Sequence, residues 1–114
     1  MHELSIAMSI VDSVIEAAEK ENASAIASFT LEIGSLSGVD IESLEFALGS
    51  AVLNTALEGV PFRIDAVRAR GVCPACASEF EVSELFDPCP GCGSYNPRIL
   101  SGRELKIKSI EIKE

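Results

Sequence analysis

The sequence predicts an α+β fold, in which a small mixed three-stranded sheet packs with two helices and a four-cysteine module is inserted into this domain. Three observations support the prediction. The 114 residues suffice for one small domain with a smaller insert, but not for two full-size cores. Apolar residues recur at helical spacing in two segments and alternate with polar residues along the predicted strands. Cysteine, proline and glycine are concentrated in one stretch, residues 71–100.

The first helix is predicted over residues 4–18. Its apolar side chains recur three or four residues apart, which places them on one face, and charged residues fall outside this face. We expect the helix to end near residues 21–24, where Asn22 can act as a terminator. The apolar face consists of Leu4, Ala7, Met8, Val11, Val14, Ile15 and Ala18.

A half-buried strand is predicted over residues 27–33, because apolar and polar side chains alternate strictly there. Residues 34–38 form a turn-rich connection. A second helix then begins at Ile41, keeps its apolar spacing as far as Thr55, and is expected to end near Glu58-Gly59, ahead of Pro61. A second strand follows over residues 62–66. A strand–helix–strand unit favours a parallel pair of strands joined by a right-handed crossover.

Residues 71–100 differ in composition from the rest of the chain and are bounded by Gly71 and Gly102. Alternating apolar residues return in the final segment, which we expect to rejoin the sheet as its last strand, over residues 105–112. The predicted organisation is therefore a domain formed by residues 1–70 and completed by residues 101–114, with residues 71–100 as an inserted module.

The charge of the chain is unevenly distributed. The formal net charge is −9, and residues 1–60 hold ten acidic residues against one basic residue, Lys20. So acidic a surface repels phosphate backbones, which argues against nucleic acid as a partner. The sequence contains no apolar stretch long enough to cross a membrane and no basic signal segment near its N-terminus. We therefore expect a cytoplasmic protein without membrane insertion.

The four cysteines form two C-x-x-C pairs, Cys73-Pro74-Ala75-Cys76 and Cys89-Pro90-Gly91-Cys92. Two such pairs at this spacing are typical of a four-thiolate zinc site, here a zinc ribbon. The alternatives are two disulfides, which a reducing cytoplasm disfavours, or a redox C-x-x-C, which would open a long helix in a larger fold. Four thiolates leave no open coordination position, so we predict a structural metal and no catalytic role for it.

The N-terminus carries the single histidine of the chain, His2. An exposed histidine without a role is one reading. The other is a chelate: methionine before a large residue should escape removal, so the amine of Met1, the amide nitrogen of His2 and its imidazole could bind one metal ion. Planar nitrogen donors suit Ni(II) or Cu(II). Glu3 adds a carboxylate or a further amide nitrogen beside them.

Several segments together resemble the HypA/HybF family of nickel metallochaperones for [NiFe]-hydrogenase maturation. The resemblance extends over essentially the whole chain. It rests on Met1-His2-Glu3, the paired C-x-x-C, Leu31-Glu32-Ile33-Gly34, Leu36-Ser37-Gly38-Val39-Asp40, Ser43-Leu44-Glu45-Phe46-Ala47 and Leu57-Glu58-Gly59. It implies Ni²⁺ as a transient cargo bound by Met1, His2 and Glu3, with Asp40 as a further contact, and structural Zn²⁺ bound by Cys73, Cys76, Cys89 and Cys92. Asp40 also precedes the second helix, where a helix N-cap explains it equally well.

The resemblance further implies two partners, a HypB-type GTPase and the hydrogenase large-subunit precursor, although urease is another nickel enzyme that could be served. The alternative function is a zinc-ribbon interaction or regulatory module without nickel. An enzyme is not expected, because the sequence offers one histidine, a saturated metal site, and neither a nucleophile–base pair nor a phosphate-binding loop.

Overall fold

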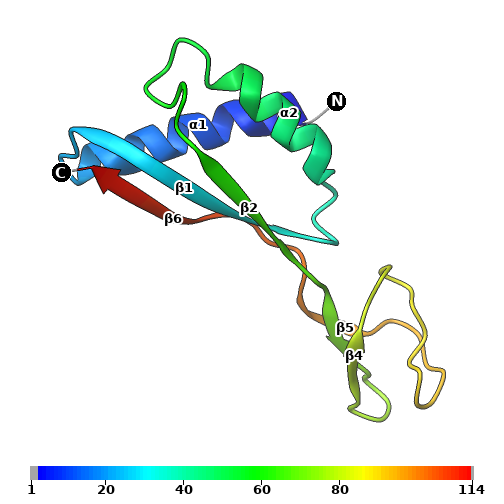
Figure 1. Cartoon of the computed structure of the whole chain (residues 1–114). Coiled ribbons are helices and arrows are strands. Elements are labelled where there is room, and N and C mark those ends of the chain that lie inside the picture. The colour runs from blue at the N-terminus through cyan, green and yellow to red at the C-terminus, as the bar shows by residue number, and fades with distance from the viewer. Residues whose placement is uncertain (1–2, 114) are drawn as a thin grey trace. The chain divides into compact units, whose positions relative to one another are not determined.

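The computed structural model describes residues 3–113, which divide into two compact units. The first, here called the helix–sheet unit, comprises Met1–Glu32, Val39–Asp65 and Lys106–Glu114. The second, here called the cysteine unit, comprises Ile33–Gly38 and Ala66–Leu105. The order of elements is α1, β1, α2, β2, β3, β4, β5 and β6 (Figure 1). The mixed α+β fold with two helices and three-stranded sheets agrees with the prediction.

Two helices belong to the helix–sheet unit, α1 (Glu3–Lys20) and α2 (Ile41–Ala51). The buried residues of α1 are part of the predicted apolar face. In α2, the buried face includes Leu44 and Leu48. The second helix is shorter than predicted, since it ends at Ala51 and not near Glu58-Gly59. The buried residues of α1 are Ala7, Val11, Val14 and Ala18.

The early end of α2 has a local cause. Asn54 has a positive φ of 63°, which an α-helix does not allow. Thr55 Oγ1 donates to the carbonyl of Val52 at 2.6 Å and accepts from the N–H of Leu57 at 3.1 Å, so it replaces helical hydrogen bonds by turn bonds. Val52 is nevertheless buried, so Val52 and Thr55 continued the helical spacing in the sequence although both lie beyond the end of α2.

One three-stranded sheet has the order β2-β1-β6, from β2 (Phe62–Val67), β1 (Ala25–Gly34) and β6 (Leu105–Lys113). The N–H of Phe29 donates to Pro61 and that of Ser35 to Val67, so residue numbers rise together and β1 and β2 are parallel. Gly34 donates to Glu104 whereas Ser24 donates to Lys113, so β6 is antiparallel to β1. The sheet is mixed, as predicted.

The helices cover one side of this sheet (Figure 1). Phe29 and Leu31 of β1 are buried, and the rings of Phe29 and Phe62 stack with centroids 5.3 Å apart. The intervening residues of the strands carry charge. Asp65 pairs with Arg63 at 2.9 Å and with Lys108 at 3.0 Å. The alternation of apolar and polar residues thus separates a covered face from a polar one.

The cysteine unit contains a second sheet of order β4-β3-β5, built from β3 (Arg70–Val72), β4 (Glu79–Glu81) and β5 (Arg98–Ser101). Both pairings are antiparallel, and the register of the β3–β5 pair shifts between Arg70 and Gly71. These strands were not predicted, because three or four residues are too few for an alternating pattern to be recognised. The core cluster of the unit consists of Ala69, Cys73, Phe80, Val82 and Cys89.

Within residues 3–113, no helix has both the length and the apolar character that crossing a membrane requires.

Candidate metal centres

The four cysteines lie on two loops with the same local structure. In each loop the N–H two residues after the first cysteine donates to its sulfur, from Ala75 to Cys73 at 3.4 Å and from Gly91 to Cys89 at 3.3 Å. A residue with positive φ follows each second cysteine, Ala77 at 65° and Gly93 at 79°. The chain therefore forms two equivalent knuckles, each of which presents a pair of sulfurs.

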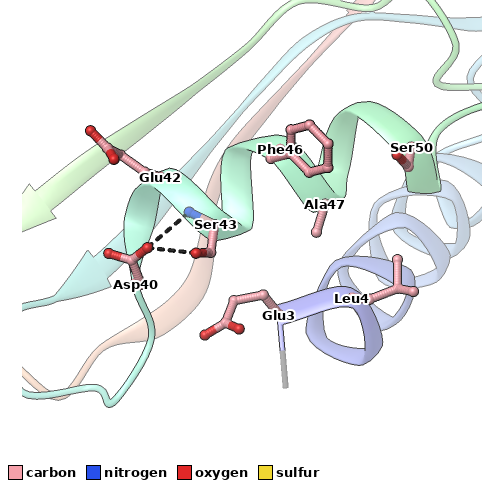
Figure 2. Close-up of a pocket in the computed structure, with 8 residues that line it drawn as sticks. All are labelled: Glu3, Leu4, Asp40, Glu42, Ser43, Phe46, Ala47 and Ser50. Carbon is pink, nitrogen blue, oxygen red and sulfur yellow. Dashed lines mark hydrogen bonds between the residues drawn. The ribbon is translucent and has the colours of Figure 1, made fainter. Parts of the chain in front are cut away.

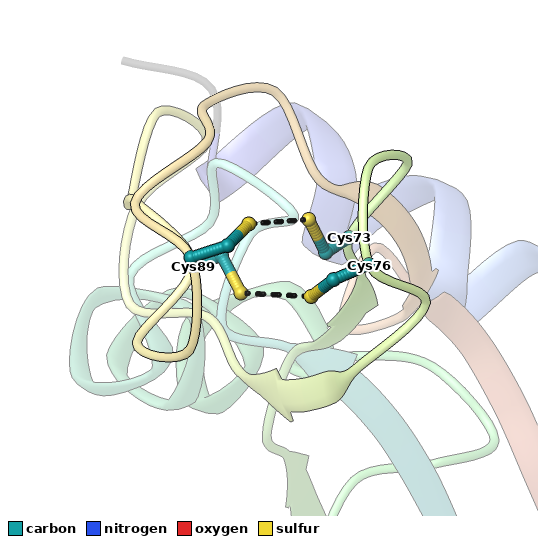
Figure 3. A group of neighbouring side chains, drawn as sticks. Cys73, Cys76 and Cys89 are labelled. Atoms are coloured by element: carbon teal, nitrogen blue, oxygen red, sulfur yellow. Dashed lines mark hydrogen bonds between the residues drawn. The ribbon is translucent and has the colours of Figure 1, made fainter.

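The two knuckles face one another across the cysteine unit (Figure 3). The four sulfur atoms all lie within 4.8 Å of one another, with Cys73 to Cys92 at 3.5 Å and Cys76 to Cys89 at 3.7 Å. A tetrahedral metal with metal–sulfur bonds of about 2.3 Å separates its sulfurs by about 3.8 Å. No cysteine is in a disulfide. The arrangement therefore fits one four-coordinate ion held by four thiolates, which is a closed, structural metal site.

Polar neighbours prepare the exposed sulfurs for deprotonation. The Ser78 hydroxyl, which lies 3.2 Å from the Cys76 sulfur, and the Ser78 backbone lower the pKa of Cys76 to about 6. Ser94 in the same way lowers the pKa of Cys92. At Cys73, backbone hydrogen bonding from Cys76 and Ala75 favours the thiolate, but burial and the neighbouring thiols outweigh it and raise the pKa. Binding of a metal must therefore displace the proton of the Cys73 thiol.

Ser78 and Ser94 were missed in the sequence analysis. The signal was present, because Cys-Pro-x-Cys-x-Ser occurs twice, at Cys73–Ser78 and at Cys89–Ser94. Each serine carbonyl also accepts from the N–H of the first cysteine of its knuckle, at 2.9 Å for Cys73 and 2.8 Å for Cys89. The serines thus close the knuckle through the backbone and stabilise the exposed thiolate through the side chain.

The helix–sheet unit contains a cavity of about 450 Å³, which is lined by the start of α1 and by residues along α2. Glu3, the first residue of α1, and Asp40, immediately before α2, both line it (Figure 2). These two residues are far apart in the sequence, yet they were both among the predicted nickel contacts. The other two predicted contacts, Met1 and His2, lie outside the described residues.

Asp40 is the N-cap of α2. Its Oδ2 accepts from the N–H of Ser43 at 3.1 Å and from the Ser43 hydroxyl at 2.6 Å. These bonds, the side-chain one first, lower the pKa of Asp40, so it is a carboxylate at neutral pH. Because the cap uses Oδ2, Oδ1 takes no part in it. The N-cap explanation is therefore correct, and it leaves one oxygen that could bind a cation.

The fold and the four-thiolate site together define a small α+β metal-binding protein. A family model described as "Hydrogenase/urease nickel incorporation, metallochaperone, hypA" matches residues 1–112, and the chain belongs to this HypA family. The family resemblance predicted from the sequence is thereby confirmed, and with it the expectation of a nickel metallochaperone of hydrogenase maturation.

The relatives match along nearly their whole length. The hydrogenase maturation factor HypA of Parabacteroides distasonis is 49% identical over 114 residues, which cover 100% of this chain and 99% of that protein. The HypA of Geobacter metallireducens is 44% identical, with 98% and 99% covered. The solution structure of the Ni metallochaperone HypA from Helicobacter pylori superimposes with a TM-score of 0.68 at 25% identity, and covers 98% of this chain and 97% of that one.

Proposed function

We propose that this protein binds Ni(II) through Met1, His2 and Glu3, with Asp40 as a further contact, and delivers it to a [NiFe]-hydrogenase precursor. The observation that carries the proposal is that Glu3 and Asp40 line one cavity, in a chain that belongs to a family of nickel metallochaperones. Met1, His2 and Glu3 are consecutive residues, so the donor atoms of Met1 and His2 are covalently close to Glu3. Nickel is the cargo of this site and not a resident cofactor.

The chemistry of these residues suits delivery. An amine, an amide nitrogen and an imidazole are planar nitrogen donors of the kind that Ni(II) prefers. Carboxylate oxygens from Glu3 and Asp40 are weaker ligands for this ion, and they can be replaced by the ligands of an acceptor. The protein therefore acts as a carrier and not as an enzyme.

The second metal in this proposal is zinc, bound by Cys73, Cys76, Cys89 and Cys92. The thiolate set and the sulfur separations support a closed site, in which the ion stabilises the fold of the cysteine unit. Residues 1–70 with 101–114 thus carry the nickel function and residues 71–100 the zinc function. The protein is expected in the cytoplasm, and its proposed partners there are a HypB-type GTPase and the large-subunit precursor of the hydrogenase.

Nickel titration of protein with its native N-terminus tests the proposal. The wild-type protein should contain one zinc and take up nickel, whereas His2→Ala should lose tight nickel binding and hydrogenase maturation yet keep its zinc and its thermal transition. Asp40→Asn is the matched second variant, because the amide oxygen can still cap α2 while the charge is lost. Protein that contains zinc but never binds nickel would instead support the zinc-ribbon interaction module.

A one-residue extension before Met1 tests the amine as a ligand. With histidine in third position, the amine, two amides and the imidazole could fill all four planar positions. We expect such a protein to bind nickel more tightly and to fail in hydrogenase maturation, since no planar position is left for the acceptor. Maturation at the native rate would exclude the free amine as a working ligand.

A further inference from the structure

The groove between α1 and α2 combines an exposed apolar surface with the acidic end of the helix–sheet unit. Phe46 of α2 lines the cavity described above, and 82% of its surface is exposed. Leu4 of α1 lines the same cavity and is 41% exposed. Figure 2 shows Phe46, Ala47 and Leu4 along the cavity, with Glu3 and Asp40 at one end of it.

The apolar surface continues along both helices. Met8, one helical turn after Leu4, is 56% exposed. Leu53, in the turn that follows α2, is also 56% exposed, although neither Met8 nor Leu53 lines the cavity itself. Single exposed apolar residues are common on protein surfaces, but Leu4 and Phe46 lie together in one concave site, which is typical of an interface. An apolar groove of this kind binds an apolar side chain of another polypeptide.

The charges around the groove define what kind of polypeptide fits. Glu3, Asp40 and Glu42 line the cavity, and Glu45 follows on α2. The sole basic residue among residues 1–60 is Lys20, at the far end of α1, where it pairs with Glu16 at 3.5 Å. A partner segment with an apolar side chain flanked by lysine or arginine would therefore be attracted, and an acidic segment would be repelled.

We propose that this groove docks a basic amphipathic segment of the protein that receives the nickel, the hydrogenase precursor. The inference rests on the proposed function and specifies its partner surface. The groove ends at Glu3 and Asp40, the proposed nickel contacts. A precursor segment bound in the groove would therefore hold the precursor beside the nickel, and for this reason we assign the groove to the precursor. Phe46 anchors this segment and is not a nickel ligand.

Binding of the purified hydrogenase precursor to the full chain, measured by biolayer interferometry, tests the proposal. Phe46→Ser should weaken binding about ten- to a hundredfold, the effect of losing one well-buried phenylalanine contact. Phe86→Ser is the matched control, because Phe86 is 73% exposed but belongs to the cysteine unit. It should bind the precursor as the wild-type protein does.

Charge gives an independent second pair of variants. Glu42→Lys should slow association with the precursor at low salt, and added salt should reduce the difference from wild type. Glu21→Lys makes the same change just beyond the far end of α1 and should leave association at the wild-type rate. Equal effects of both variants would show that net charge alone governs association, which would overturn the assignment of the groove.

Other results would also overturn the proposal. One is wild-type affinity of Phe46→Ser for the precursor, and another is an equal loss of affinity in Phe86→Ser. A third is that Phe46→Ser weakens binding only to the HypB-type GTPase. A change confined to self-association in sedimentation would assign the groove to a second copy of this chain. Nickel titration of Phe46→Ser should match that of the wild-type protein, so this variant separates the docking groove from the nickel site. If the wild-type protein takes no nickel, the proposed function fails, and precursor binding still decides the role of the groove.

Discussion

The helix–sheet unit buries side chains from α1, α2 and the β2-β1-β6 sheet, whereas the core cluster of the cysteine unit contains two thiols, Cys73 and Cys89, among its five members. Apolar burial alone can stabilise the first unit. The second has a small apolar core and short strands, so we expect its stability to depend on an ion bound by its two knuckles. One chain thus combines a unit stabilised by apolar packing with a unit whose four clustered cysteines suit a structural metal.

Loss of one thiolate should give the largest effect. Cys76 is exposed, so Cys76→Ser removes a ligand without creating a cavity in the core. We expect the protein to lose its structural metal and the amide protection of β3, β4 and β5, while α1 and β1 stay protected. Metal analysis and amide hydrogen exchange measure both outcomes. Loss of protection throughout the chain would show that the two units share their stability.

The opposite experiment weakens the helix–sheet unit. Leu44 of α2 is fully buried, and Leu44→Ala should destabilise this unit by about 2–5 kcal/mol, through lost burial and a residual cavity. The cysteine unit should keep its metal at denaturant concentrations that unfold the helices. Circular dichroism follows the helices, and a chromogenic chelator follows metal release. Release of the metal together with helix unfolding would show that the two units do not unfold independently.

Acid should affect the cysteine unit through its thiolates. Because the Ser78 hydroxyl helps to hold the pKa of metal-free Cys76 at about 6, Cys76 is a thiolate at neutral pH, and the affinity for the metal falls as the pH drops below that value. Ser78→Ala should raise this pKa, so that metal release on acidification begins roughly half a unit to one unit higher in pH. Metal retention against pH measures the shift.

Ser83→Ala is the control for Ser78→Ala. It removes a hydroxyl in the same unit that makes no hydrogen bond within the described part of the chain. Its metal should be released at the wild-type pH. An equal shift in both variants would mean that the hydroxyl beside Cys76 has no specific effect.

The smallest expected effect compares the two knuckles directly. Ala77 adopts the left-handed conformation that Gly93 adopts in the other knuckle. Ala77→Gly should remove the steric cost of this conformation and stabilise the cysteine unit by roughly 0.5 kcal/mol, since the added freedom of the unfolded chain offsets part of the gain. Gly93→Ala should do the reverse. Amide exchange in β3 measures both changes, and stabilisation by Gly93→Ala would contradict the equivalence of the knuckles.

Much of the helix–sheet unit could be predicted from the sequence, because its elements are long enough to repeat their pattern. α1 shows its face over several turns, and β1 alternates Phe29, Leu31 and Ile33 with polar residues. The end of α2 was predicted wrongly, because Val52 and Thr55 continue the helical spacing but lie in the turn after the helix. Apolar spacing alone does not reveal the backbone conformation of the residues that show it.

The candidate metal centres were predictable to different degrees. The spacing of the cysteines was enough to predict the four-cysteine site, since each C-x-x-C pair is a local turn that presents two sulfurs. The proximity of Glu3 to Asp40 was implied only by family resemblance, because it depends on how α1 packs against α2. No local pattern indicates that residues 33–38 belong to the cysteine unit, where the N–H of Leu36 donates to Gly102 at 2.7 Å. Such long-range pairings arise from tertiary structure.

The antiparallel pairing of β6 with β1 has a consequence for synthesis of the protein. β1 ends at Gly34, and its partner Glu104 is made seventy residues later. At about 5–20 residues per second, the ribosome leaves β1 without this neighbour for on the order of 4–14 s. During that interval the apolar face of β1 has helices to cover it, but one of its edges has no strand to pair with. A nascent chain stalled before Leu105 would therefore expose an open sheet edge, the feature through which unfinished β-proteins aggregate.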